Sequence, residues 1–196
     1  MRLLLATHNA HKLIEIRNLF LGTSVEILGL DNYPDIPEAP EDHDTFEANA
    51  MQKAQFVFGR TGVATVADDS GIEIAALEWG PGVHSKRFTP EATTASNNAR
   101  VLQELQGEAD RRARYRCALA LVTDAGTASA DGTCHGNIGE VARGDGGFGY
   151  DPLFWPTDYP GRTMAEVSME EKNRISHRAR AFSQLPDLLR QLGYTL

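Results

Sequence analysis

The start of the chain alternates a short apolar run, a segment with helical periodicity and a second apolar run. This alternation constrains the fold more than any other feature. Residues 2–7 (RLLLAT) are apolar, end at a polar turn and predict a buried strand. Apolar residues then recur at helical spacing over residues 10–21, and residues 24–30 (SVEILGL) predict a second strand. Because strands interleave with helices in this way, we expect an α/β fold with a mixed sheet.

The rest of the chain continues this alternation without a repeat or a linker, so we expect one domain over residues 1–196. Thr45 is expected to cap a helix that ends at Gly62. Pro90 is expected in the first turn of a helix over residues 89–106. The predicted strands are residues 63–67, 71–77, 114–124 and 127–139, the last two forming a hairpin that residues 140–144 (EVARG) extend.

Two loops and a final helix complete the expected organisation. Residues 32–44 contain three prolines and many acids, and residues 144–152 (GDGGFGYDP) are rich in glycine, so both predict loops. The last helix is expected to begin at about Ser176, where the serine can cap it. Pro186 must kink or divide this helix.

Charge and hydropathy exclude several classes of partner. The formal net charge of −8 argues against a broad nucleic-acid-binding surface, which is usually basic. No apolar stretch approaches the ~20 residues of a membrane span, and the N-terminal apolar run is too short for a signal peptide. We therefore expect a cytoplasmic protein that binds neither nucleic acid nor membrane. Cys117 and Cys134 have no metal-like spacing and are expected to be reduced and buried.

The first stretch that could carry chemistry is THNAHK, residues 7–12. It lies where the first strand meets the first helix, and a helix N-terminus offers unpaired N–H groups that suit a phosphate. Thr7 and Asn9 add hydrogen-bonding groups, and Lys12 adds a full positive charge. A helix cap beside a solvated lysine accounts for the same residues, so this pattern alone leaves both interpretations open.

The second stretch is VADDSG, residues 66–71, with two adjacent aspartates after an apolar run. Successive strand residues point to opposite faces, so Asp68 and Asp69 can share a site only if the strand has already ended. Ser70 and Gly71 are turn formers, and they predict such an ending. Paired acids at a strand end suit Mg²⁺, which takes one or two carboxylates and completes its shell with water and phosphate oxygens. An ordinary turn explains the pair equally well.

The third stretch is the glycine-rich loop at residues 144–152. Its glycines let the backbone approach a ligand closely, and Phe148 or Tyr150 could stack on a base. The alternative is a glycine turn whose aromatic side chains lie in the core.

The fourth stretch is EEKNRISHRARAF, residues 170–182. If Ser176 caps the last helix, His177 and Arg178 fall in its first turn, where the helix dipole favours acids instead. A local preference broken in this way indicates a role other than stability, although exposed side chains without any particular role give the same pattern.

Taken in order, the stretches ATHNAHKLIEI, TFEANAMQKA, VADDSGIEIAAL, GPGVHSKRF, GGFGYDPLF and AEVSMEEKNRISHRARAF cover the chain from its first strand to its last helix. Together they resemble the inosine triphosphate pyrophosphatase family, the RdgB-like purine nucleoside triphosphate pyrophosphatases. The resemblance implies hydrolysis of ITP, dITP and XTP to the monophosphate and pyrophosphate, with Mg²⁺ as cofactor and a homodimer as the assembly. It also implies an elongated mixed β-sheet flanked by helices, in two lobes with a substrate cleft between them.

The resemblance also implies roles for individual residues. Asp69 matches the base that activates water, and Asp68, Asp69 and Glu47 are the expected metal ligands. The residues implied to bind substrate are Thr7, Asn9, Lys12, Lys53, Ser70, Phe148, Gly149, Tyr150, Asp151, Lys172, His177 and Arg178. Within this set Phe148 is expected to stack on the purine. Donors such as Arg178 and protonated His177 would pair with the O6 acceptor of hypoxanthine or xanthine and be left unpaired opposite adenine, at a cost of ~1–3 kcal/mol.

One position departs from the family pattern. The family usually reads T-F-x-E-N-A with a metal-binding glutamate, whereas this chain reads TFEANA and has Ala48 at that place. Glu47 lies one residue earlier, about 100° around a helix. Glu47 could substitute, another acid such as Glu15 or one from residues 38–44 could serve, or the aspartate pair could hold the metal alone. We expect activity to be retained; the alternatives are a nucleotide-binding homologue with weakened or lost hydrolysis and a phosphohydrolase of different nucleotide specificity.

Overall fold

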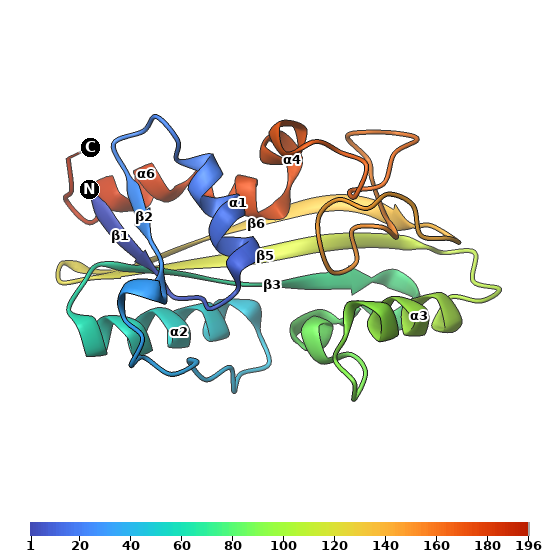
Figure 1. Ribbon diagram of the computed structural model, residues 1–196, viewed down its shortest axis with the longest axis horizontal. Helices are drawn as coiled ribbons and strands as arrows, with labels where there is room; N and C mark the ends of the chain where they lie inside the picture. Colours follow the sequence, from blue (N-terminus) through green and yellow to red (C-terminus); the bar gives the residue numbers. More distant parts are fainter. Residues whose placement is uncertain (196) are drawn as a thin grey trace. The chain divides into compact units, whose positions relative to one another are not determined.

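The computed structural model describes residues 1–195, and its elements are traced in Figure 1. The strands are β1 (Arg2–Leu5), β2 (Glu26–Leu28), β3 (Thr65–Ile74), β4 (Gly80–Pro81), β5 (Arg112–Thr123), β6 (Gly126–Ile138) and β7 (Phe154–Pro156). The α-helices are α1 (Ala10–Leu19), α2 (Phe46–Thr61), α3 (Thr94–Glu104), α4 (Met169–Ile175), α5 (His177–Phe182) and α6 (Leu185–Gln191). Short 3₁₀ helices are η1 (Leu30–Asn32), η2 (Ala75–Leu77) and η3 (Gly82–Arg87). No helix within residues 1–195 is long and apolar enough to cross a membrane.

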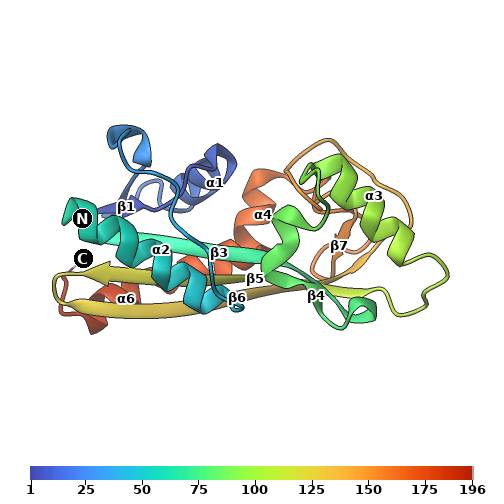
Figure 2. The ribbon, with the colours of Figure 1, turned by 90° about the horizontal axis from the view of Figure 1, so that it is seen from below.

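The strands form a mixed sheet in the order β2-β1-β3-β5-β6-β7, with β4 paired to β3. β1 runs parallel to both β2 and β3, whereas β4 and β7 pair antiparallel with β3 and β6. β5 and β6 are neighbours joined by a two-residue turn, which only an antiparallel pair permits, and Figure 2 shows this hairpin from below. The α/β class, the mixed sheet and the hairpin are therefore confirmed.

The chain divides into two compact units. Unit 1 contains Met1–Asp69, Cys117–Gly132 and the chain from Arg178 onward, and unit 2 contains Ser70–Arg116 and Thr133–His177. Strands β3, β5 and β6 contribute residues to both units. A single functional domain and a substrate cleft remain predictions.

The core of unit 1 follows from the periodicity of its first elements. Leu3 and Leu5 of β1, two residues apart, point to the same face of the sheet, as strand alternation requires. They pack in one apolar cluster with Ile16 of α1 and with Leu185 and Leu189 of α6. α2 begins after the cap Thr45 and ends at Gly62, whose φ of 66° is left-handed, so both predicted ends are confirmed.

The core of unit 2 gathers around the β-strand residues Ile72 and Ile74 and the fully buried Phe154. Tyr115 and Tyr150 belong to the same cluster. Cys117 of unit 1 and Cys134 of unit 2 are both buried thiols, as the sequence predicts.

Several predicted boundaries are wrong. β3 continues unbroken through Ser70 and Gly71, so the expected strand end at this point does not occur. Residues 140–144 do not extend the sheet. α3 begins at Thr94 because Thr93 and Ser96 form a capping box, which leaves Pro90 outside the helix. β7 and α4 were not predicted.

The C-terminal helix divides as the proline requires. Pro186 lies in the first turn of α6, where its missing N–H costs no helical hydrogen bond, and α5 ends before it at Phe182. Ser176 ends α4 with an extended backbone, and His177 and Arg178 begin α5.

Candidate active site

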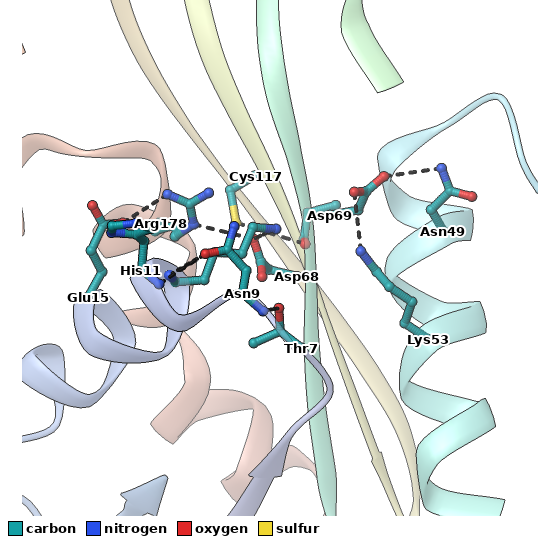
Figure 3. A network of polar contacts seen from close by, with 12 residues as sticks. Thr7, Asn9, His11, Glu15, Asn49, Lys53, Asp68, Asp69, Cys117 and Arg178 are labelled. Carbon is teal, nitrogen blue, oxygen red and sulfur yellow. Dashed lines mark hydrogen bonds and ion pairs between the residues drawn. The ribbon is translucent and has the colours of Figure 1, made fainter. Parts of the chain in front are cut away.

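Asp68 and Asp69 point to opposite sides of β3 and meet different partners. Because the strand does not end at Ser70, successive side chains alternate between its two faces. Figure 3 shows Asp68 on the side of α1 and α5 and Asp69 on the side of α2. Both residues are buried, with 2% of Asp68 and 7% of Asp69 exposed. Burying a carboxylate is costly without a cation or hydrogen-bond donor beside it, and each of these two carboxylates has such partners.

Asp68 is held by two cations. Its Oδ2 accepts from Lys12 Nζ at 2.9 Å and from Arg178 Nε at 3.3 Å. Arg178 also donates from its Nη1 to Oε2 of Glu15 at 2.8 Å, and Glu15, Arg178 and Asp68 are all buried. The parallel register of β1 with β3 brings the start of α1, and therefore Lys12, toward Asp68. These four side chains form a compact charge cluster, the Asp68 cluster.

The pKa values in this cluster follow from burial and charge. Burial raises the pKa of Asp68, but the nearby Lys12, Arg178 and Lys53 charges more than reverse this and leave that pKa well below its usual range. Burial lowers the pKa of Lys12, and Asp68 only partly offsets it. Burial also acts against the charge of Arg178, yet Asp68 and Glu15 raise its pKa. Asp68 is thus ionised at neutral pH and anchors two cations.

Asp69 has a different environment on the other face. Its Oδ1 accepts from Lys53 Nζ at 3.2 Å, and its Oδ2 accepts from Asn49 Nδ2 at 3.1 Å. Both partners lie on the buried side of α2, four residues apart and hence on one helix face. Lys53 Nζ also donates to Oε1 of Glu41 at 2.8 Å, so two carboxylates converge on one ammonium group. Asn49 and Lys53 both hold Asp69.

The pKa of Asp69 moves in the opposite direction from that of Asp68. Burial raises the pKa of Asp69, Lys53 and Lys12 lower it, Glu41 raises it again, and the net shift is upward. Burial opposes the charge on Lys53, but Asp69, Asp68 and Glu41 raise its pKa. The environment thus lowers the pKa of one carboxylate and raises that of its neighbour. Such a difference is typical of sites in which one acid is a proton-transfer group and the other stays ionised.

The N-terminus of α1 is closed by side-chain caps. Asn9 Oδ1 accepts from the backbone N–H groups of His11 at 3.0 Å and Lys12 at 3.3 Å. Thr7 Oγ1 accepts from Asn9 N–H at 3.2 Å. The helix-cap interpretation of THNAHK is therefore correct for Thr7 and Asn9. The solvated-lysine interpretation is wrong for Lys12, because the Asp68 cluster holds its ammonium group.

Asp151 organises a second group of side chains within unit 2. Its Oδ2 accepts from Lys172 Nζ at 2.8 Å and from the Phe148 backbone N–H at 3.0 Å. Its Oδ1 accepts from Tyr115 Oη at 3.1 Å. Lys172 Nζ lies 5.3 Å from the centroid of the Phe148 ring. The glycine before Phe148 is required, because Gly147 has a φ of 70° and a Cβ there would lie 2.1 Å from Asp151 Oδ2.

The sequence and the fold of this chain match known proteins. A model of the Ham1 family matches residues 3–188 of this chain. The chain belongs to the Ham1 family. It is 44% identical to a dITP/XTP pyrophosphatase of Geobacter sulfurreducens, in an alignment that covers 96% of each protein. It is 45% identical to a dITP/XTP pyrophosphatase of Porphyromonas gingivalis, in an alignment that covers 96% of this chain and 97% of that protein. A solved HAM1 protein from Coxiella burnetii superposes with a TM-score of 0.86 at 36% identity, over 97% of this chain and 99% of the other.

Within this Ham1 chain the structure brings several predicted site residues together. Lys12 meets Asp68, Lys53 meets Asp69, and Lys172 meets Asp151. His177 belongs to unit 2, where its ring stacks on Tyr115, and Arg178 belongs to unit 1, in the Asp68 cluster. His177 and Arg178 therefore contact different groups in the structure, and their joint action on the base stays a prediction.

The remaining predicted residues lie in or next to the glycine-rich loop or on β3. Tyr150 is buried, its hydroxyl donates to the Ser85 carbonyl at 2.6 Å, and burial raises its pKa. It therefore supports the loop from the core, as the alternative of a glycine turn with core aromatic side chains expects, and a contact of Tyr150 with substrate stays a prediction. Gly149 accepts at its carbonyl from Asn98 Nδ2 at 3.1 Å, and Ser70 lies half-buried on β3.

The metal prediction requires a correction. Asp68 and Asp69 cannot hold one ion together because they lie on opposite faces of β3. Glu47 is exposed in the first turn of α2, and among residues 1–195 no group of three or more acidic, histidine or cysteine side chains is arranged to hold a metal. Glu41 and Asp69 do converge on one cation, Lys53 Nζ. Two carboxylates are a donor set that fits Mg²⁺, which completes its shell with water and phosphate oxygens.

Glu41, Asn49 and Tyr115 were missed as site residues by sequence reasoning. Glu41 lies in the 38–44 loop, whose acids the sequence offers only as a group, and its contact with Lys53 Nζ distinguishes it from the others. Asn49 carries a recognisable signal, since it precedes Lys53 by one helical turn. Tyr115 carries none, because it reads as an ordinary apolar strand residue.

Proposed function

We propose that this protein hydrolyses deaminated purine nucleoside triphosphates, namely ITP, dITP and XTP, to the nucleoside monophosphate and pyrophosphate. Ham1 relatives named dITP/XTP pyrophosphatases at 44–45% identity over nearly the whole chain support this proposal. The observation that carries it within the site is the buried Asp69, which keeps a raised pKa while Lys53 and Asn49 fix both of its oxygens.

Asp69 is suited to act as the general base toward water. A raised pKa makes a carboxylate a stronger base at neutral pH, and a positioned base contributes about 10²–10⁴-fold to the rate. The hydrogen bonds from Lys53 and Asn49 fix the plane of the carboxylate. A water held by Asp69 would lose its proton to that group as it attacks the α-phosphorus and pyrophosphate leaves.

Cationic groups in unit 1 suit the phosphate chain. Lys12 and Lys53 each bring an ammonium group beside one of the two aspartates. Charge that develops on phosphoryl oxygens is stabilised by cations fixed in advance, without covalent chemistry. Asp68, whose pKa is lowered by these cations, keeps Lys12 and Arg178 in place.

We infer that Glu41 and Asp69 would hold the Mg²⁺ that the Ham1 resemblance implies. When bound, Mg²⁺ neutralises charge on phosphate oxygens and helps to orient the attacking water. Glu41 and Asp69 would then contact both Lys53 and the ion. This assignment replaces the missing glutamate at Ala48 with an acid from the 38–44 loop.

The Asp151 group of unit 2 suits recognition of the base. Phe148 offers a flat ring for stacking, and Lys172 offers three N–H donors, so that it can donate to Asp151 and also to an acceptor on a base. Hypoxanthine and xanthine present an acceptor at O6, whereas adenine presents a donor there. A buried donor left unpaired opposite adenine costs ~1–3 kcal/mol, which disfavours ATP.

We further infer that the protein works in the cytoplasm as a homodimer that binds neither membrane nor nucleic acid. The net charge of −8 and the family resemblance support this inference. Size-exclusion chromatography with light scattering at micromolar concentration tests the dimer directly, and a mass of one chain would contradict it.

The decisive experiment offers ITP, XTP, dITP, GTP and ATP to the protein with Mg²⁺ and identifies the products. Pyrophosphate and monophosphate from the first three nucleotides, with little from ATP, are expected. Release of orthophosphate, or faster turnover of ATP than of ITP, would point to a phosphohydrolase of different specificity. Nucleotide binding without any release would point to a homologue that no longer hydrolyses.

A further inference from the structure

We propose that Tyr115 is a positioning residue that fixes two members of the base-recognition group, Asp151 and His177. The proposal deepens the proposed function and rests on it, because the resemblance assigns both partners to the purine. Tyr115 itself belongs to no motif that the sequence offered.

The contacts of Tyr115 come from the two ends of its side chain. Its hydroxyl donates to Asp151 Oδ1 at 3.1 Å. Its ring stacks on the His177 imidazole with centroids 4.7 Å apart and planes inclined by 14°. The ring also contacts Phe154, at 4.5 Å between centroids and 49° between planes. Tyr115 is 7% exposed on β5, so its ring is fixed by the core of unit 2.

The hydroxyl completes the hydrogen bonding of Asp151. Lys172 Nζ and the Phe148 N–H both donate to Oδ2, and Tyr115 donates to Oδ1. Bonds to Oδ2 alone leave the carboxylate able to turn about its own axis, because χ2 of aspartate is a broad torsion. The bond to Oδ1 fixes this plane. The plane of Asp151 in turn sets where Lys172 and the Phe148 backbone are held.

The ring acts on His177 independently of the hydroxyl. Near-parallel stacking at 4.7 Å sets the plane of the imidazole, and aromatic pairs in this geometry are more stable than their buried area alone predicts. His177 begins α5, so its backbone is fixed by the helix start while Tyr115 fixes the ring. One side chain therefore orients a carboxylate through its hydroxyl and an imidazole through its face.

The two contacts can be removed separately. Tyr115→Phe keeps the stacking on His177 and removes the bond to Asp151, while Tyr115→Leu removes both. For Tyr115→Phe we expect KM for ITP to rise roughly 3- to 30-fold, the range of one hydrogen bond, with kcat changed less than about twofold. The preference for ITP over ATP should fall by a similar factor. Tyr115→Leu should raise KM further.

The matched control is Tyr194→Phe. Tyr194 donates its hydroxyl to Asp124 Oδ1 at the exposed end of the β5–β6 hairpin, so it loses the same type of bond away from the Asp151 group. Its KM and selectivity should equal those of the unsubstituted protein. Thermal unfolding of all variants is measured in parallel, because a purely structural role would lower Tm and leave KM and selectivity unchanged.

Calorimetric titration with inosine 5′-monophosphate separates this proposal from the proposed function. Weaker monophosphate binding by Tyr115→Phe than by Tyr194→Phe supports the role of Tyr115 whether or not pyrophosphate is released. Equal binding, equal KM and unchanged selectivity would overturn it, as would a loss confined to kcat. An unsubstituted protein that binds the monophosphate but releases no pyrophosphate contradicts the proposed function only, and one that binds no purine nucleotide contradicts both.

Discussion

Asp68 and Asp69 are adjacent in sequence, yet their carboxylates lie on opposite sides of β3 and have pKa values shifted in opposite directions. Asp68 is surrounded by Lys12 and Arg178 and stays ionised. Asp69 is buried beside Lys53 and keeps a raised pKa. The two adjacent carboxylates therefore have separate surroundings: Asp68 holds Lys12 and Arg178, whereas Asp69 holds Lys53 and is the residue proposed above as the base.

The first prediction tests Asp69 as the base. Asp69→Asn retains the size of the side chain and removes its basicity, so kcat for ITP should fall about 10²–10⁴-fold. Binding of inosine 5′-monophosphate, measured by calorimetry, should change less than about threefold. The control Asp35→Asn alters an exposed carboxylate and should leave both quantities unchanged. A near-normal rate for Asp69→Asn would remove this residue from the base role.

The second prediction tests Glu41 as a metal ligand. Glu41→Gln removes one of the two carboxylates that converge at Lys53, so the Mg²⁺ concentration for half-maximal rate should rise roughly 10-fold or more. Glu47→Gln should leave that concentration unchanged, because Glu47 is exposed in the first turn of α2. If Glu47→Gln shifts the requirement and Glu41→Gln does not, the two assignments must be exchanged.

Ala48→Glu extends this test to the position where the resemblance leads us to expect a glutamate. If a carboxylate at residue 48 adds to the metal set, the same half-maximal concentration should fall. An unchanged value would mean that a carboxylate at residue 48 adds no ligand to the metal site.

The third prediction concerns the buried pair of Glu15 and Arg178. Glu15→Gln leaves Arg178 without one of its two carboxylates, and breaking a buried pair costs about 3–5 kcal/mol of unfolding free energy. Asp187→Asn removes an exposed partner of Arg190 and should cost no more than about 1 kcal/mol. Urea unfolding monitored by circular dichroism measures both. Equal, small losses would show that Arg178 is satisfied by Asp68 alone.

Sequence patterns predicted correctly those features that depend only on neighbouring residues, such as the ends of a helix. The ends of α2 follow from Thr45 and Gly62, which act on the backbone within one turn, so sequence reasoning located them correctly. The strand end predicted at Ser70 and Gly71 was wrong for a related reason. Both residues favour turns locally, but pairing with neighbouring strands keeps them extended. Tertiary pairing overrode the local preference at this point.

Contacts between distant residues could not be predicted. The lysines and aspartates of unit 1 were singled out one by one, but their pairing depends on the parallel register of β1 with β3 and on the position of α2. Tyr115 and Asp151 are 36 residues apart, and Arg178 and Glu15 are 163 apart. No spacing rule connects such positions, so their partners required the fold.

The fourth prediction is a pH dependence of stability that originates at Glu171. This residue closes the capping box of α4, the helix that carries Lys172, and also pairs with Arg162. The hydrogen bond from Arg162 and the backbone N–H of Ser168 lower the pKa of Glu171 from 4.5 to about 2. Because the folded pKa lies below the unfolded one, the carboxylate stabilises the fold above pH 4.5.

That stabilisation is lost as the pH falls from 4.5 toward 2, as Glu171 takes up a proton in the unfolded state first. Glu171→Gln should therefore unfold at a lower temperature than the unsubstituted protein at neutral pH, and the difference in Tm should shrink steadily across this window. Glu91→Gln, at an exposed position, should show no such convergence. A difference in Tm for Glu171→Gln that stays constant between pH 6 and pH 3 would mean that the cap acts through hydrogen bonding of either protonation state, independent of the carboxylate charge.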